Sequence, residues 1–196
     1  MFARDDFFGL NKERLKVKQD FDVSFVGTSH SNRMITIRKL RDILRQHNLK
    51  FKFYVYVPFF MGLKGVFLTR RLKRDELMFN TLSKKELKNL LLRSRYVLDL
   101  PSPEQSGITP RVLEALASGC SIITTNQSIR DAPFFDDKYI SIVNSDRLSS
   151  IPSILENRPD TEIQLNLEQY SLSNWLKIIF QTAMNLKRQN IIAGLL

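Results

Sequence analysis

The chain has 196 residues, of which 43% are hydrophobic and 26% are charged, and its 30 Lys and Arg against 20 Asp and Glu give a formal net charge of +10. This length forms one domain or two small ones, which excludes a large multidomain enzyme. One cysteine excludes an internal disulfide, and two histidines argue against a Cys/His zinc site. The positive charge indicates an anionic partner, such as a nucleotide, a phosphate or an anionic lipid headgroup.

No secretory or membrane-spanning segment is predicted. Charged residues occupy positions 4–6, where a signal peptide would be apolar. The most apolar region, 51–68, is interrupted by two lysines and a proline and is shorter than the ~20 residues that span a bilayer. We therefore expect a cytoplasmic protein, with peripheral contact at the inner face of the plasma membrane left open.

The first part of the chain predicts strands that alternate with helices. A short apolar strand over 22–26 precedes a segment from 35 to about 46 with apolar residues at helical spacing. Aromatic and β-branched residues predict a second strand over 51–57. Residues 59–79 combine apolar residues at partly helical spacing with a basic cluster, which predicts an amphipathic helix.

Two helix starts are visible in the middle of the chain. Ser83 and Glu86 are spaced as a capping box, in which each side chain bonds the backbone of the other residue. After a predicted strand over 96–100, Thr109 is placed as an N-cap with Pro110 in the first turn. We expect this second helix to end near residue 118, just before a glycine.

The remaining elements complete an alternating α/β pattern. Strands are predicted over 121–125 and 139–143, the signals over 144–166 are mixed, and a helix is predicted over 167–188. Strands separated by helices predict a Rossmann-like, doubly wound parallel sheet.

We divide the chain into three parts. Residues 1–21 are expected to form a linker or N-terminal extension, residues 22–166 the Rossmann-like domain, and residues 167–196 a C-terminal helix that packs on it. No internal repeat is visible.

Ligands of such sheets bind beyond the carboxyl ends of the strands, and the first loop there runs from Gly27 to Arg33. Glycine permits close approach of the backbone to a ligand, and an arginine adds several donors for a phosphate. His30 lies in the same turn and is placed to donate to a phosphate or sugar oxygen. Alternatively, Gly27 serves only the turn and His30 is a solvated loop residue.

The second loop, 101–109, leads into the helix that starts at Thr109. Its serine and glycine residues and the capped helix start predict an anion site. Arg111 and Glu114 are three positions apart and so share one helix face. The carboxylate of Glu114 is placed either to accept hydrogen bonds from ribose hydroxyls or to form a surface ion pair of little energetic weight. The spacing does not choose between these.

The stretch 98–126 (LDLPSPEQSGITPRVLEALASGCSIITTN) resembles the nucleotide-sugar-binding half of GT-B glycosyltransferases, and in particular bacterial lipopolysaccharide and capsule biosynthesis proteins. The segments 20–33 (DFDVSFVGTSHSNR) and 171–180 (SLSNWLKIIF) are similar to further motifs of that group. The resemblance extends from about residue 1 to residue 187. The matching positions in the central motif are Asp99, Gln105, Ser106, Gly107, Ile108, Thr109, Arg111, Glu114 and the run 123–126.

This resemblance implies transfer of a sugar from a nucleotide-sugar to a lipid-linked glycan acceptor. Glu114 matches the second of two glutamates, eight positions apart, that hold the donor in many retaining enzymes, and its role there is to bind the ribose. The first falls at Ser106, which is not acidic, so the stereochemistry is not assigned. The backbone of 107–109 would bind the diphosphate, with Arg33 and Arg111 balancing its charge. The resemblance implies no metal ion and no cofactor.

A complete GT-B enzyme has two domains, and the opening MFARDDFFGL resembles the segment that follows the first of them. We therefore expect either a fragment or a chain that works with a separate N-terminal-type domain or protein. His30 is the one candidate for a catalytic base. Residues 59–74 are predicted either to lie in an anionic membrane surface or to pack in the core with a solvated basic end.

Three functions follow from these patterns. The first is a hexosyltransferase, and the second is a non-catalytic nucleotide-binding remnant or subunit. The third, a basic nucleic-acid-binding domain, lacks a zinc-finger, RRM or helix-turn-helix signature.

Overall fold

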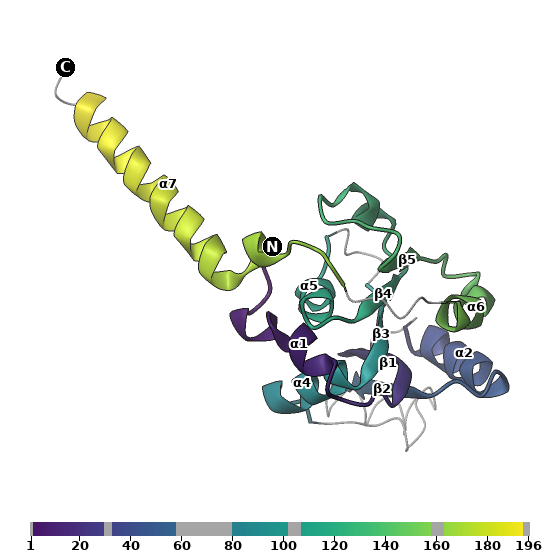
Figure 1. Ribbon diagram of the computed structural model, residues 1–196. Helices are drawn as coiled ribbons and strands as arrows, with labels where there is room; N and C mark the ends of the chain where they lie inside the picture. The colour runs from purple at the N-terminus through teal and green to yellow at the C-terminus, as the bar shows by residue number, and fades with distance from the viewer. Residues whose placement is uncertain (1, 30–32, 58–79, 102–106, 158–162, 194–196) are drawn as a thin grey trace.

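The computed structural model describes residues 2–29, 33–57, 80–101, 107–157 and 163–193. Its centre is a five-stranded sheet in the order β2-β1-β3-β4-β5, in which every pairing is parallel (Figure 1). This confirms the predicted Rossmann-like fold class. The strands are β1 (Phe21–Thr28), β2 (Phe51–Tyr56), β3 (Ser94–Asp99), β4 (Ser121–Thr124) and β5 (Ile140–Ile142).

Helices cover both faces of the sheet, so the domain is doubly wound. One face packs against α1 (Leu10–Arg14), α4 (Lys84–Leu92) and α5 (Pro110–Ala117). The other packs against α2 (Arg33–Gln46) and α6 (Ile151–Glu156). The chain also forms α7 (Leu172–Ala193) and the short 3-10 helices η1 (Asp5–Phe7), η4 (Gln127–Asp131), η5 (Leu148–Ser150) and η6 (Glu168–Tyr170).

The direction of winding reverses between β1 and β3. From β1 the chain moves outward to β2, then returns to the other side of β1 to form β3 and continues to β4 and β5. In doubly wound sheets such a switch point opens a crevice at the carboxyl edge, because the loops on its two sides lead away from each other. The two loops singled out in the sequence are the ones that flank this switch point.

Local signals placed the start of α4 and the end of α5 correctly, whereas α7 starts and ends five residues later than the predicted 167–188. Ser83 and Glu86 form the predicted capping box, with distances of 2.8 Å from Ser83 N to Glu86 Oε2 and 3.3 Å from Glu86 N to Ser83 Oγ. Helix α5 ends with Ser118 as its C-cap, and Gly119 follows at φ 79°, a conformation that favours glycine. The helix predicted over 59–79, including the proposed membrane contact at 59–74, lies outside the described residues.

The N-terminal segment belongs to the folded domain and is not the linker expected for 1–21. Ala3, Phe7 and Leu10 are between 0% and 6% exposed and pack in the core beneath α4 and α5. Arg14 is also buried, and its Nη1 donates to the Leu91 carbonyl oxygen at 2.9 Å. That contact satisfies a carbonyl at the C-terminal end of α4, where a cation is favourable.

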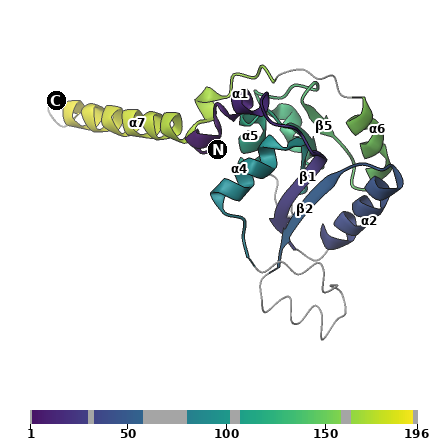
Figure 2. The same cartoon turned by 60° about the horizontal axis from the view of Figure 1, so that its bottom comes forward.

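Helix α7 extends away from the sheet, and both views show it as an arm (Figure 1, Figure 2). Its start is fixed by the Phe2 and Trp175 rings, 4.7 Å apart, and by Ser173 Oγ, which donates to Asp5 Oδ2 at 2.9 Å. The packing expected for this helix is therefore observed at its beginning, and the described side chains from 180 to 185 are exposed. No helix in the described ranges combines the length and apolarity needed to cross a bilayer. Among the side chains of α7 that the structure describes, the exposed large apolar ones are Leu176, Ile178, Ile179, Phe180 and Met184.

The burial of the N-terminal segment predicts a large effect of truncating Phe7. Phe7→Ala is expected to lower the free energy of unfolding by about 3 kcal/mol, because it removes a fully buried ring from the core. Urea denaturation would measure the loss. Leu15→Ala, at a side chain that is 70% exposed, is the matched control and should change stability by less than about 0.5 kcal/mol. Equal effects of the two changes would contradict the packing described here.

Candidate functional site

A buried carboxylate stands at the carboxyl end of β3. Asp99 is 6% exposed and accepts hydrogen bonds from Thr124 Oγ1 at 2.7 Å and Thr109 Oγ1 at 3.1 Å. Burial raises the pKa of Asp99 above its ordinary value, while the two hydroxyl donors and the charge of Arg33 act in the opposite direction. Through these contacts Asp99 connects β3, the end of β4 and the residue that precedes α5.

Thr109 occupies the predicted N-cap position of α5, but its side chain does not cap the helix. The hydroxyl donates to Asp99 Oδ1 at 3.1 Å, and its oxygen accepts from no N–H of the helix. The predicted N-cap residue and helix start are therefore confirmed, without a side-chain capping hydrogen bond. As a result, the Thr109 side chain accepts from none of the N–H groups in the first turn of α5, which leaves that turn suited to an anion.

Arg33 lies at the start of α2, across the switch point from α5. Its Nη1 donates to the Thr28 carbonyl oxygen at 2.9 Å. Burial lowers the pKa of Arg33, and the nearby charge of Asp99 opposes that shift. Arginine stays protonated at neutral pH despite such a shift, so Arg33 places a positive charge near Asp99 at the switch point.

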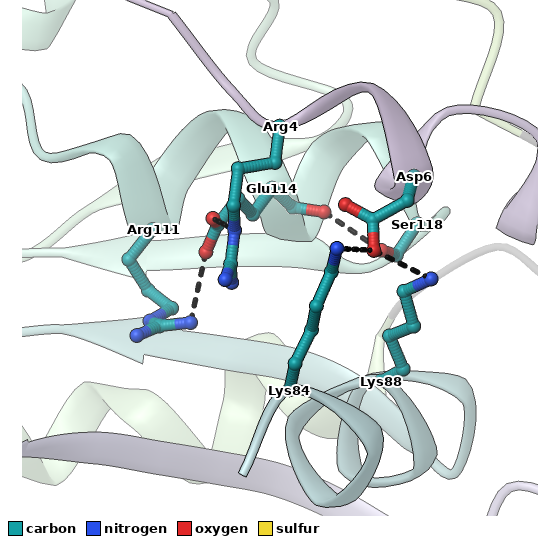
Figure 3. A network of polar contacts seen from close by, with 7 residues as sticks. All are labelled: Arg4, Asp6, Lys84, Lys88, Arg111, Glu114 and Ser118. Atoms are coloured by element: carbon teal, nitrogen blue, oxygen red, sulfur yellow. Dashed lines mark hydrogen bonds and ion pairs between the residues drawn. The ribbon is translucent and has the colours of Figure 1, made fainter. Parts of the chain in front are cut away.

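Glu114, expected either to bind a ribose or to form a surface pair, is buried between two arginines (Figure 3). Its side chain is 7% exposed; Oε1 accepts from Arg4 Nε and Oε2 from Arg111 Nη1, both at 2.9 Å. Burial lowers the pKa of Arg111, and the charge of Glu114 opposes that shift. The charge of the carboxylate is thus already neutralised by two arginines. The alternative prediction of an ion pair on the surface is wrong, because the Glu114 side chain is buried.

A second ion-pair cluster holds the N-terminal segment beside this one (Figure 3). Asp6 Oδ2 lies 2.6 Å from Lys84 Nζ and 2.7 Å from Lys88 Nζ, both on α4. Burial raises the pKa of Asp6, but the hydrogen bonds and charges of the two lysines outweigh it, so the net shift is downward. The N-terminal segment is therefore tied to α4 by Asp6 and to α5 by Arg4.

A pocket of about 210 Å³ opens at the carboxyl ends of β1 and β2. Of the predicted site residues, Gly27 and Arg111 line it, together with Thr28 and Tyr56. A side chain at Gly27 would bring its Cβ to 2.7 Å from the Phe25 ring. Packing within β1 therefore accounts for the glycine, while its backbone still lines the pocket.

The other predicted residues divide into two groups. The first group is described: Gly107 is exposed, and its carbonyl oxygen accepts from Asn126 Nδ2 at 3.3 Å, while Ile108 packs against the core. The second group, His30, Gln105 and Ser106, lies outside the described residues.

In the described ranges, no group of three or more His, Cys, Asp or Glu side chains is arranged to hold a metal ion.

Three polar residues that support the site were named in the sequence only as positions of the motif that carries the resemblance, without a role in the site. They are Asp99, Thr124 and Asn126, each between 0% and 7% exposed. Thr124 Oγ1 accepts from Asn126 N at 3.0 Å and also donates to Asp99. A usable signal existed, since each stands at or just after the end of an apolar strand.

No protein-family model matches the sequence, and no curated protein matches it. Solved structures with a similar fold include the C-terminal domain of a glycosyl transferase group 1 family protein (LpcC) from Francisella tularensis, with 14% identity over 79% of this chain and 85% of that chain and a TM-score of 0.44. TarM shows 11% identity over 72% and 28%, with a TM-score of 0.46. The catalytic domain of starch synthase IV from Arabidopsis thaliana, bound to ADP and acarbose, shows 12% identity over 95% and 46%, with a TM-score of 0.49. The chain thus spans less than half the length of the last two.

The raised pKa of Asp99 predicts a pH-dependent stability. A carboxyl whose pKa is higher in the folded state stabilises the fold at low pH and loses that contribution as pH rises through the folded pKa. Wild type should therefore lose stability relative to Asp99→Asn as pH rises above about 4, the ordinary range of Asp. Denaturant unfolding at several pH values would measure the difference. Thr124→Val, which removes one hydroxyl donor, should steepen the trend, whereas a difference independent of pH would contradict it.

The burial of Glu114 predicts a structural cost for removing it. Glu114→Ala should lower the free energy of unfolding by about 2 kcal/mol, because it leaves Arg111 partly buried without its carboxylate; partial exposure of both arginines keeps the loss below that of a fully buried pair. Chemical denaturation would measure it. Glu13→Ala, at an exposed position of α1, is the control. A loss no larger than that of the control would refute the ion-pair role.

Proposed function

We propose that this domain binds the diphosphate of a nucleotide-sugar at the switch point between β1 and β3. In this proposal it serves the transfer of the sugar to a lipid-linked glycan acceptor in lipopolysaccharide or capsule biosynthesis, on the cytoplasmic face of the membrane. The observation that carries it is the position of Arg33, at the start of α2, close enough to Asp99, at the end of β3, for their charges to interact. The sequence resemblance supports the class of ligand.

The chemistry of the switch point suits a diphosphate. The first turn of α5 directs N–H groups toward the loop, and the positive end of the helix dipole favours an anion there. A Cβ added at Gly107 would meet no atom within 4 Å, so the backbone before the helix borders open space. Arg33 and Arg111 supply positive charge in the role that a metal ion has in other nucleotide sites.

A ribose contact at Glu114 would require a rearrangement of its ion pairs. Both carboxylate oxygens already accept from arginines at 2.9 Å. Arg4 is the more exposed of the two partners, with 40% of its side chain accessible against 28% for Arg111. In this proposal Arg4 gives up its oxygen to the ribose hydroxyls, while Arg111 keeps the remaining charge neutralised.

A second candidate function is a nucleotide-binding subunit that does not catalyse transfer alone. It is favoured by Ser106, which stands where a donor-binding glutamate would be, and by the engaged state of Glu114. The exposed apolar side chains of α7, such as Phe180 at 66%, support a separate acceptor-binding domain as the partner.

Calorimetric titration with UDP-, GDP-, CDP- and dTDP-sugars would test the binding proposal. Arg33→Ala should weaken binding of the preferred donor at least about tenfold, since a lost charge-assisted hydrogen bond is worth about 1.5–3 kcal/mol. Arg45→Ala is the matched control: it removes an arginine from the same helix, at the far end from the switch point and paired with Asp42. It should leave binding unchanged.

Two outcomes would overturn the proposal: no donor binds, or Arg33→Ala binds as tightly as Arg45→Ala. If binding is found, a transfer assay with the chain alone then separates the two candidate functions. Turnover without a partner supports the transferase, and binding without turnover supports the subunit.

A further inference from the structure

A second pocket lies at the same edge of the sheet, at the far side from β2. It has a volume of about 440 Å³ and is built from the segments that follow β4 and β5. Gln127 and Arg130 come from η4, and Asn144 and Arg147 from the loop after β5. The carboxyl edge is where α/β sheets bind ligands, yet this pocket is distinct from the switch point between β1 and β3.

The lining of this pocket carries positive charge, and no carboxylate in the lining neutralises it. Arg130 and Arg147 both line it, and no Asp or Glu does. Asp131 and Asp146 neighbour the two arginines in sequence, but neither belongs to the lining. In contrast to the paired arginines at positions 4, 45, 93, 95 and 111, Arg130 and Arg147 form no ion pair with a carboxylate of the described ranges.

The backbone that carries the two arginines is held in place. Gln127 Nε2 donates to Asn144 Oδ1 at 3.1 Å and so links the two segments. The N–H of Arg147 donates to the Asn144 carbonyl oxygen at 3.0 Å, and Ser150 Oγ donates to the Arg147 carbonyl oxygen at 2.8 Å. Two guanidinium groups on anchored segments lose less freedom on binding than groups on loose loops would.

We propose that Arg130 and Arg147 form a binding site for a phosphate ester. Guanidinium groups match phosphate geometry because they offer parallel N–H donors to its oxygens. Ile142, Val143 and Ile154 form an apolar wall of the same pocket, against which an organic part of the ligand packs. The volume exceeds that of a phosphate alone, which favours an ester such as a sugar phosphate over the free ion.

Titration of the full chain with glucose 1-phosphate and with inorganic phosphate would test this site. Glucose 1-phosphate should bind at least tenfold more tightly than inorganic phosphate, because only the ester contacts the apolar wall. The double variant Arg130→Gln/Arg147→Gln should weaken glucose 1-phosphate binding at least tenfold. Both side chains are exposed, so its thermal unfolding should match that of wild type. Arg45→Gln, another exposed arginine, is the control and should bind as wild type does.

Each remaining outcome would overturn the inference. If glucose 1-phosphate does not bind, or if it binds equally tightly to wild type and to the double variant, the proposed site is refuted. If glucose 1-phosphate and inorganic phosphate bind with equal affinity, the apolar wall does not contact the ligand and the preference for an ester is refuted. Loss of binding in Arg33→Gln with retention in the double variant would place the ligand at the switch point instead. Because nucleotide-sugar binding is tested through Arg33, failure here is distinguishable from failure of the proposed function.

Discussion

The buried carboxylate of Asp99 is the contact on which the arrangement of the candidate site depends. It stands where β3 ends and accepts hydrogen bonds from a residue of β4 and from the N-cap residue that precedes α5. An ionised carboxylate in the interior is costly unless such donors compensate it, so the two threonines are held close to it. The position of the α5 N-terminus therefore follows from a side chain of the neighbouring strand, and Arg33 faces the same charge across the switch point.

The N-terminal segment imposes a second constraint, this time on α5 itself. Arg4 occupies one oxygen of Glu114, and Asp6 binds two lysines of α4 (Figure 3). These ion pairs join the segment to two helices on one face of the sheet, where the burial of Phe7 adds an apolar contact. Glu114, for which the resemblance implies ribose binding, thus has a structural role, and a ribose bound there would compete with Arg4 for the same oxygen.

Local patterns explain which elements the sequence predicted well. The Ser83–Glu86 capping box and the glycine after α5 act within a few residues, so their geometry is encoded where they stand. Strand β1 was predicted shorter than it is, because Gly27 has low strand propensity and marked the end of the predicted strand; pairing with β2 carries the strand on through Thr28. Thr109 was correctly predicted as the N-cap residue of α5, but its side-chain acceptor, Asp99, lies on another element and was not predicted.

By itself the sequence determined the alternation of strands and helices, the parallel fold class and the two loops that flank the switch point, because hydrophobic periodicity and turn residues act locally. Only the tertiary structure decided what those loops contact. Arg4 and Glu114 are 110 positions apart, and the link from Gln127 to Asn144 joins segments after two different strands. Such pairings arise when the sheet brings distant strand ends to one edge. The direction of α7, away from the sheet, was likewise invisible in its helical pattern, which encodes an apolar face and not its partner.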